Sequence, residues 1–155
     1  MKRITPVVMV VVVAIVAVAS LVLAPDVTAE EPTAAAVSPE GVPNDGVVAF
    51  YFHGNVRCAT CRKIEAYADE AIAQGFAAEL ASGRLTWRVV NIDDAGNKHF
   101  IQDFQLVTRS VVLAEYRSGK AVRWQNLDKV WQLVRSKDSF VEYVQGEATE
   151  FLGES

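Results

Sequence analysis

The feature that most constrains this chain is its pair of cysteines, Cys58 and Cys61, which are the only two among 155 residues. An uninterrupted apolar run, 47–52, precedes them, and a pattern typical of a helix begins close to Arg62. A buried strand that leads into a C-x-x-C motif at the start of a helix is typical of redox-active cysteine pairs. The pair therefore predicts both a local structure and a chemistry.

The position of the first cysteine at a helix start favours its thiolate, because unpaired N–H groups and the positive end of the helix stabilise negative charge there. Cys61 lies one helical turn further on, close enough to close a disulfide with Cys58. We therefore expect Cys58 to be the attacking nucleophile and Cys61 the resolving thiol. A purely structural disulfide is the alternative, but it would close a loop so short that it removes little unfolded-state entropy.

Residues 1–29 have the pattern of an export segment. Two basic residues stand near the start, residues 6–24 carry no charge, and 27–29 offer small residues for cleavage. The apolar stretch is long for a cleaved signal and just long enough to span a membrane, so a retained anchor is the alternative to a cleaved signal. In either case we expect the rest of the chain at the periplasmic or extracytoplasmic face, with the membrane contacted only through this segment.

Composition divides the remainder into a tether and one domain. Residues 30–45 are rich in Ala, Pro, Glu and Ser without an apolar period, which predicts a flexible linker. Residues 46–155 are enough for one compact domain. The net charge of the chain is −4, and an acidic chain is a poor candidate for nucleic-acid binding.

Hydrophobic periodicity predicts an alternation of strands and helices in this domain. The first strand, 46–53, is apolar throughout and is therefore expected to be buried on both faces. The later elements are expected as a helix from Cys61, a short helical piece up to Leu80, a strand at 85–92, a helix at 98–104, strands at 111–116 and 121–124 joined by a hairpin turn, and helical segments from Leu127 with a break near 136–138. This order predicts an α/β fold with a central mixed sheet and helices on both of its faces.

This order, with a C-x-x-C motif between the first strand and the first helix, resembles the thioredoxin superfamily from Gly46 to about Leu152. The string 51–65, YFHGNVRCATCRKIE, is similar to an exported thioredoxin-like family labelled ArsF-type, or nitrophenyl compound nitroreductase subunit. The resemblance implies a thioredoxin-like fold, a redox-active disulfide, and protein thiols, protein disulfides or a redox partner protein as partners. Nothing in the sequence resembles a flavin or nicotinamide site, so no cofactor is expected beyond the disulfide.

Two departures from the thioredoxin pattern affect the predicted site. Arg57 stands where thioredoxins usually carry Trp, and Ala59-Thr60 replaces their Gly-Pro, so their redox potential does not carry over. Matching Val111 and its neighbours to the third strand puts Arg109 at the position of the thioredoxin cis-proline. The backbone at that position normally pairs with a bound substrate strand, so the resemblance does not extend to substrate binding there.

Three nearby side chains are candidates for tuning the cysteine pair. Arg57 and Arg109 are cations that favour a thiolate if they face Cys58, and each is also consistent with a surface or loop residue. His53, at the end of the first strand, could join Cys58 and Cys61 as a ligand set for Cu(I) or Zn. A histidine in that place is more often simply hydrogen-bonded.

Together these observations predict an exported thiol-disulfide oxidoreductase that exchanges disulfides with partner proteins. A metal-binding or metal-delivery module for Cu or Zn, using the same cysteines and His53, is the first alternative. A non-catalytic subunit that uses the thioredoxin fold as an interaction platform in a larger complex is the second. Insulin reduction, stoichiometric metal binding, and a complex that survives loss of both cysteines distinguish the three.

Overall fold

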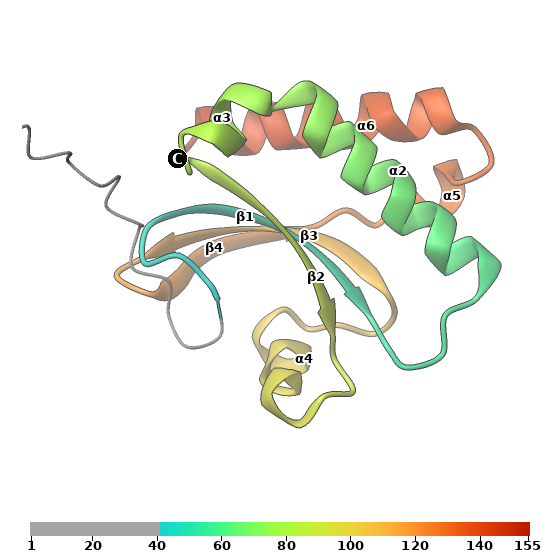
Figure 1. Cartoon of the computed structure of the whole chain (residues 1–155), viewed down its shortest axis with the longest axis horizontal. Coiled ribbons are helices and arrows are strands. Elements are labelled where there is room, and N and C mark those ends of the chain that lie inside the picture. Colours follow the sequence, from blue (N-terminus) through green and yellow to red (C-terminus); the bar gives the residue numbers. More distant parts are fainter. Residues whose placement is uncertain (1–40) are drawn as a thin grey trace, which may run out of the picture. The chain divides into compact units, whose positions relative to one another are not determined.

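The structure, a computed structural model, describes residues 41–155; the predicted export segment and residues 30–40 of the predicted tether lie outside the described residues. The elements follow in the order β1 (Gly46–His53), α2 (Ala59–Gly75), α3 (Ala77–Ala81), β2 (Leu85–Asn91), the 3-10 turn η1 (Ala95–Asn97), α4 (His99–Asp103), β3 (Ser110–Arg117), β4 (Lys120–Asn126), α5 (Val130–Leu133) and α6 (Lys137–Gly153) (Figure 1). The predicted order of strands and helices is confirmed. No helix of this described part is long and apolar enough to cross a membrane.

The four strands form one mixed sheet in the order β2-β1-β3-β4. β1 pairs in parallel with β2 and antiparallel with β3, and β3 continues into β4 as an antiparallel hairpin. Ser118 and Gly119 make the hairpin turn with φ values of 51° and 74°, the left-handed conformation that two-residue hairpins favour. β4 extends beyond the predicted 121–124 because the polar Gln125 and Asn126 still pair with β3.

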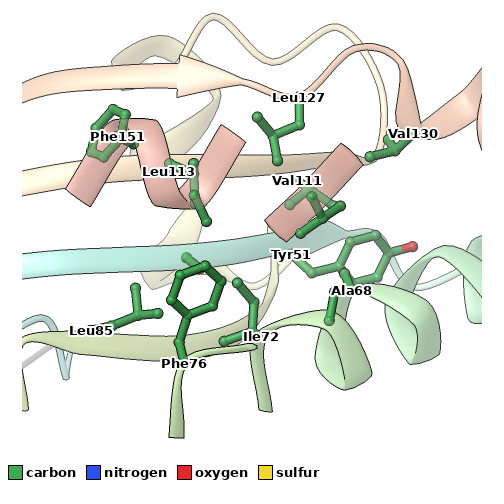
Figure 2. Packing of buried hydrophobic residues seen from close by; sticks show 14 of the residues in the cluster. Tyr51, Ala68, Ile72, Phe76, Leu85, Val111, Leu113, Leu127, Val130 and Phe151 are labelled. Carbon is green, nitrogen blue, oxygen red and sulfur yellow. The ribbon is translucent and has the colours of Figure 1, made fainter. Parts of the chain in front are cut away.

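The central strand β1 is buried on both faces, as its unbroken apolar sequence predicts: no residue of 47–52 is more than 2% exposed. Its odd-numbered side chains, such as Tyr51, pack with α2 and α6 in one hydrophobic layer (Figure 2). Its even-numbered side chains, such as Phe50 and Phe52, pack with Phe100 of α4 in the other. The mixed sheet thus has helices on both faces, and its strand order and strand directions are those of the thioredoxin-like fold, which confirms the predicted fold class.

Helix α2 begins two residues before the predicted start at Cys61. The reason is a cap that the helical periodicity does not reveal: the sulfur of Cys58 accepts a hydrogen bond from the backbone N–H of Cys61. From there the helix buries one stripe against the sheet, and that stripe consists of Cys61, Ile64, Ala68, Ala71 and Ile72. The first turn of α2 and the end of β1 therefore fix the position of both cysteines.

The last residues of the predicted tether contact the domain that follows it. Val42 is only 4% exposed and belongs to the same hydrophobic layer as α4. The carbonyl of Asn44 accepts a hydrogen bond from the N–H of Gly119, and the carboxylate of Asp45 accepts one from the N–H of Ser118. The last residues of the predicted linker 30–45 are therefore held against the domain by tertiary contacts that their composition does not show.

Candidate functional site

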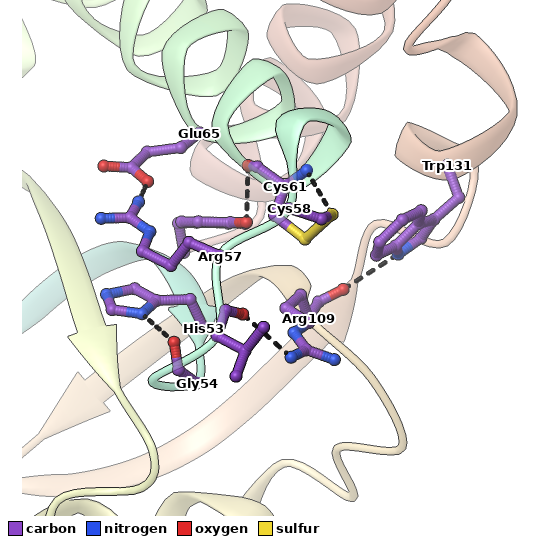
Figure 3. The surroundings of a disulfide bond; sticks show 10 residues. His53, Gly54, Arg57, Cys58, Cys61, Glu65, Arg109 and Trp131 are labelled. Carbon is purple, nitrogen blue, oxygen red and sulfur yellow. Dashed lines mark hydrogen bonds and ion pairs between the residues drawn. A yellow bond between two sulfur atoms is a disulfide. The ribbon is translucent and has the colours of Figure 1, made fainter.

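The site is built around a disulfide between Cys58 and Cys61, whose Cα atoms are 5.0 Å apart. It lies where β1 ends and α2 begins (Figure 3). Cys58 is exposed, whereas Cys61 is buried with 3% of its surface accessible. This asymmetry is what the predicted roles require, because an attacking thiol needs access to a partner and a resolving thiol does not.

Cys58 also forms the N-cap of α2. Its Sγ accepts a hydrogen bond from the N–H of Cys61 at 3.1 Å. Free N–H groups and the helix dipole concentrate positive potential at this end of a helix. A thiolate on Cys58 in the dithiol form would therefore sit at a position that stabilises negative charge.

Arg57 directly precedes the disulfide, but its positive charge is paired with a carboxylate. Its guanidinium forms an ion pair with the carboxylate of Glu65 on α2, and the two side chains are 31% and 25% exposed. Figure 3 shows this pair beside the first turns of α2, with the disulfide on the other side of the turn. Glu65 was missing from the sequence prediction, because the eight-residue separation from Arg57 spans a loop and a helix start and matches no helical spacing.

Arg109 reaches the segment that presents the cysteines. Its Nη2 donates a hydrogen bond to the carbonyl oxygen of Val56 at 3.1 Å, and its own carbonyl accepts one from Trp131 Nε1 at 2.9 Å (Figure 3). No peptide bond in residues 41–155 is cis, so the bond that precedes Arg109 is trans. The indole N–H of Trp131 thereby anchors the loop that carries Arg109.

His53 does not join the cysteines in a ligand set. Its Nδ1 lies 3.0 Å from the carbonyl oxygen of the adjacent Gly54, which is the local hydrogen bond expected of a strand-end histidine. Within the part of the chain that the structure describes, no three His, Cys, Asp or Glu side chains are grouped so that they could hold a metal ion. The alternative metal site of Cys58, Cys61 and His53 is therefore not formed, and both sulfurs are engaged in the disulfide.

Tyr51 is a second site residue that the sequence pattern does not reveal. It is fully buried under α2, and its hydroxyl donates a hydrogen bond to the carbonyl oxygen of Cys61 at 2.7 Å. Burial raises the pKa of this hydroxyl, and the charges of Arg57 and Arg109 oppose that rise. The available signal was its odd-numbered position in β1, which directs it to the same face of the sheet as the cysteine helix.

Two apolar side chains are exposed on the loops that the side chain of Arg109 joins. Val56, in the loop before Cys58, is 76% exposed, and Val107, two residues before Arg109, is 93% exposed. A shallow pocket of about 200 Å³ runs between these loops, and Gly54, Val107 and Arg109 are among its lining residues. We call Val56 and Val107 the apolar rim of the site.

No protein-family model and no curated protein matches the sequence. Among solved structures, the chain is similar to thioredoxin f2 of Chlamydomonas reinhardtii, at 18% identity and a TM-score of 0.37, covering 59% of this chain and 79% of that one. It is also similar to the oxidised thioredoxin of Plasmodium falciparum, at 15% identity, a TM-score of 0.37 and coverage of 59% and 80%. Thioredoxin of Trypanosoma brucei brucei gives 18% identity, a TM-score of 0.35 and coverage of 64% and 78%. The fold follows from the strand order and strand directions described above.

Proposed function

We propose that this chain is an exported thiol-disulfide oxidoreductase that exchanges disulfides with partner proteins through Cys58 and Cys61. The observation that carries the proposal is the asymmetry of the pair: an exposed Cys58 that caps α2, bonded to a buried Cys61. A disulfide that only stabilised the fold would not need one exposed sulfur at the positive end of a helix.

The reaction balances without a further reactant. In the reducing direction, the Cys58 thiolate attacks one sulfur of a partner disulfide, forms a mixed disulfide and releases the other partner sulfur as a thiolate. Cys61 then loses its proton and attacks the Cys58 sulfur, which closes the protein disulfide and releases the second partner thiolate. Two electrons pass to the partner, and the reverse sequence oxidises a partner dithiol.

The partner class follows from the surface around Cys58. The apolar rim, Val56 and Val107, offers exposed hydrophobic area on the two loops that the side chain of Arg109 joins, one of which presents Cys58. Such area favours a protein partner over a small charged thiol, because contact with a protein chain removes it from water. The export pattern of residues 1–29 and the similarity of the string 51–65 to the ArsF-type family support placing this exchange outside the cytoplasm.

Insulin reduction by the full chain, supplied with dithiothreitol, tests the proposal. The wild-type chain should accelerate precipitation of the insulin B chain, and the Cys58→Ser variant should not. Equal rates for the two would overturn the proposal. A Lys120→Ala variant, at the hairpin turn between β3 and β4, serves as the matched control and should behave as wild type.

A further inference from the structure

One peptide group links the hydroxyl of Tyr51 to the backbone of both cysteines. The carbonyl oxygen of Cys61 accepts the hydrogen bond from Tyr51 at 2.7 Å. The N–H of that same peptide unit belongs to Arg62, and it donates to the carbonyl oxygen of Cys58 at 3.1 Å. A hydrogen bond to one end of a peptide group polarises it and strengthens the bond at its other end. The two hydrogen bonds therefore strengthen each other and form one continuous hydrogen-bond network through the first turn of α2.

The Tyr51 hydroxyl, which is the first donor of this hydrogen-bond network, is held rigidly. Tyr51 lies on β1, which pairs with β2 at Val89 and with β3 at Val111, and its side chain has no accessible surface. Figure 2 shows its ring next to α2, close to Ala68, among the residues of the hydrophobic layer. Burial raises the pKa of the hydroxyl above its ordinary value near 10, so it keeps its proton and donates throughout the neutral range.

We propose that Tyr51 is a positioning residue that holds the first turn of α2 in place when the cysteines are reduced. The proposal rests on the proposed redox function of the pair. In the disulfide form, the S–S bond restrains Cys58 against Cys61. In the dithiol form that bond is absent, and the backbone hydrogen bonds of the turn must keep the Cys61 N–H directed at the Cys58 sulfur.

The covalent restraint in the disulfide form determines the direction in which loss of the Tyr51 hydroxyl shifts the dithiol–disulfide equilibrium. Removing the Tyr51 hydroxyl costs the dithiol form more than the disulfide form, because only the disulfide has a covalent restraint on the turn. The equilibrium then shifts toward the disulfide, and the pair becomes more reducing. The Cys58 thiolate also loses alignment with the Cys61 N–H, so the pKa of the Cys58 thiol should rise in the variant.

The test is Tyr51→Phe in the full chain, equilibrated with glutathione redox buffers. Since the loss is that of one hydrogen bond, the equilibrium constant should shift about threefold to tenfold toward the disulfide. For a two-electron couple, a tenfold shift is about 30 mV. Tyr116→Phe is the matched control: Tyr116 is also a buried tyrosine, but it lies in the other hydrophobic layer and pairs with Gly46 at the far end of β1. It should leave the constant unchanged.

A second readout separates positioning from simple stability. The unfolding free energy lost in Tyr51→Phe should be larger for the dithiol form than for the disulfide form. Equal losses in the two forms, with an unchanged glutathione equilibrium, would mean that the hydroxyl only stabilises the fold, and the proposal would be wrong. On the wild-type chain, the Arg62 amide should be protected from hydrogen exchange in the dithiol form; rapid exchange there would overturn the proposal without any variant.

The glutathione equilibrium involves no partner protein, so it tests Tyr51 separately from the proposed function. If insulin is not reduced but the equilibrium shifts as expected, the proposed function fails and the positioning role stands. If insulin is reduced and Tyr51→Phe changes nothing, the positioning role fails alone.

Discussion

The guanidinium of Arg109 donates a hydrogen bond to the carbonyl oxygen of Val56, across a sequence separation of 53 residues. This contact joins the loop before β3 to the segment that presents Cys58. The backbone of Arg109 is fixed in turn by the indole of Trp131. A cation, rather than a proline, therefore occupies the loop that borders the disulfide, and it is tied to the cysteine loop through its side chain.

Arg109→Ala tests what this cation does to the cysteines. The variant loses a positive charge beside the cysteine loop, so the pKa of the Cys58 thiol should rise, because an opposite charge favours a thiolate. Loss of the hydrogen bond to Val56 should also lower the unfolding free energy by about 0.5–1.5 kcal/mol. The thiolate absorbance of the reduced protein, followed through a pH titration, measures the first effect. Arg109→Lys keeps the charge and should titrate close to wild type; identical titrations in all three proteins would show that the charge does not act on Cys58.

The roles of the two cysteines predict different outcomes for their serine variants. Cys58→Ser removes the exposed nucleophile and should abolish exchange with partner disulfides. Cys61→Ser leaves that nucleophile but removes the buried resolving thiol, so mixed disulfides should accumulate and appear on non-reducing gels. Alkylation of the reduced wild-type chain should label Cys58 first, because Cys61 is only 3% exposed. Preferential labelling of Cys61 would reverse the two roles.

The cysteine pair and its strand-helix setting could be predicted from the sequence because each depends on a local pattern. The unbroken apolar run 47–52 identifies a strand buried on both faces, and the helical stripe after Cys61 identifies the helix that covers it. Arg109 was placed near the cysteines by matching its strand to that of thioredoxins, and the structure brings its side chain to Val56.

The remaining contacts of the site could not be predicted because they depend on where separate elements meet. Tyr51 looks like one more apolar core residue until its hydroxyl is seen to reach Cys61. The helical pattern predicts that Glu65 faces solvent, yet its carboxylate forms an ion pair with Arg57 of the preceding loop. Val42 lies in a segment with the composition of a linker. Its burial results from packing in the hydrophobic layer that contains α4, which the composition does not show.

The predicted export of the domain is tested by fusions to its C-terminus. The apolar stretch 6–24 and the basic residues before it should place the domain outside the cytoplasm. In a bacterial host, a C-terminal alkaline phosphatase fusion should then be active, and a fluorescent fusion that folds only in the cytoplasm should be dark. Deleting residues 6–24 should reverse both signals. Bright fluorescence from the intact fusion would contradict the export prediction.

At the opposite end of β3 from Arg109, Glu115 links stability to pH. Its carboxylate is buried and accepts hydrogen bonds from Arg117 at 2.8 Å and Arg123 at 3.3 Å. The hydrogen bond from Arg117 is the main cause that lowers the pKa of Glu115, with the charges of both arginines acting in the same direction. A carboxyl group with a lowered folded-state pKa stabilises the fold above its unfolded pKa, near 4.3, and this stabilisation is lost as pH falls through the folded-state value.

Glu115→Gln should therefore lower the unfolding free energy at neutral pH by about 1–2 kcal/mol, since it replaces charge-assisted hydrogen bonds with neutral ones. The difference from wild type should begin to shrink as the pH falls below the unfolded pKa of a glutamate, and should be smallest below the lowered folded-state pKa, where the wild-type carboxylate is protonated in both states. Denaturant unfolding across this pH range measures both effects. Glu154→Gln is the control: Glu154 also pairs with Arg123, but its side chain is 71% exposed, so its loss should change stability little at any pH. A difference between Glu115→Gln and wild type that stays constant with pH would mean that the carboxylate charge does not stabilise the junction of β3 and β4.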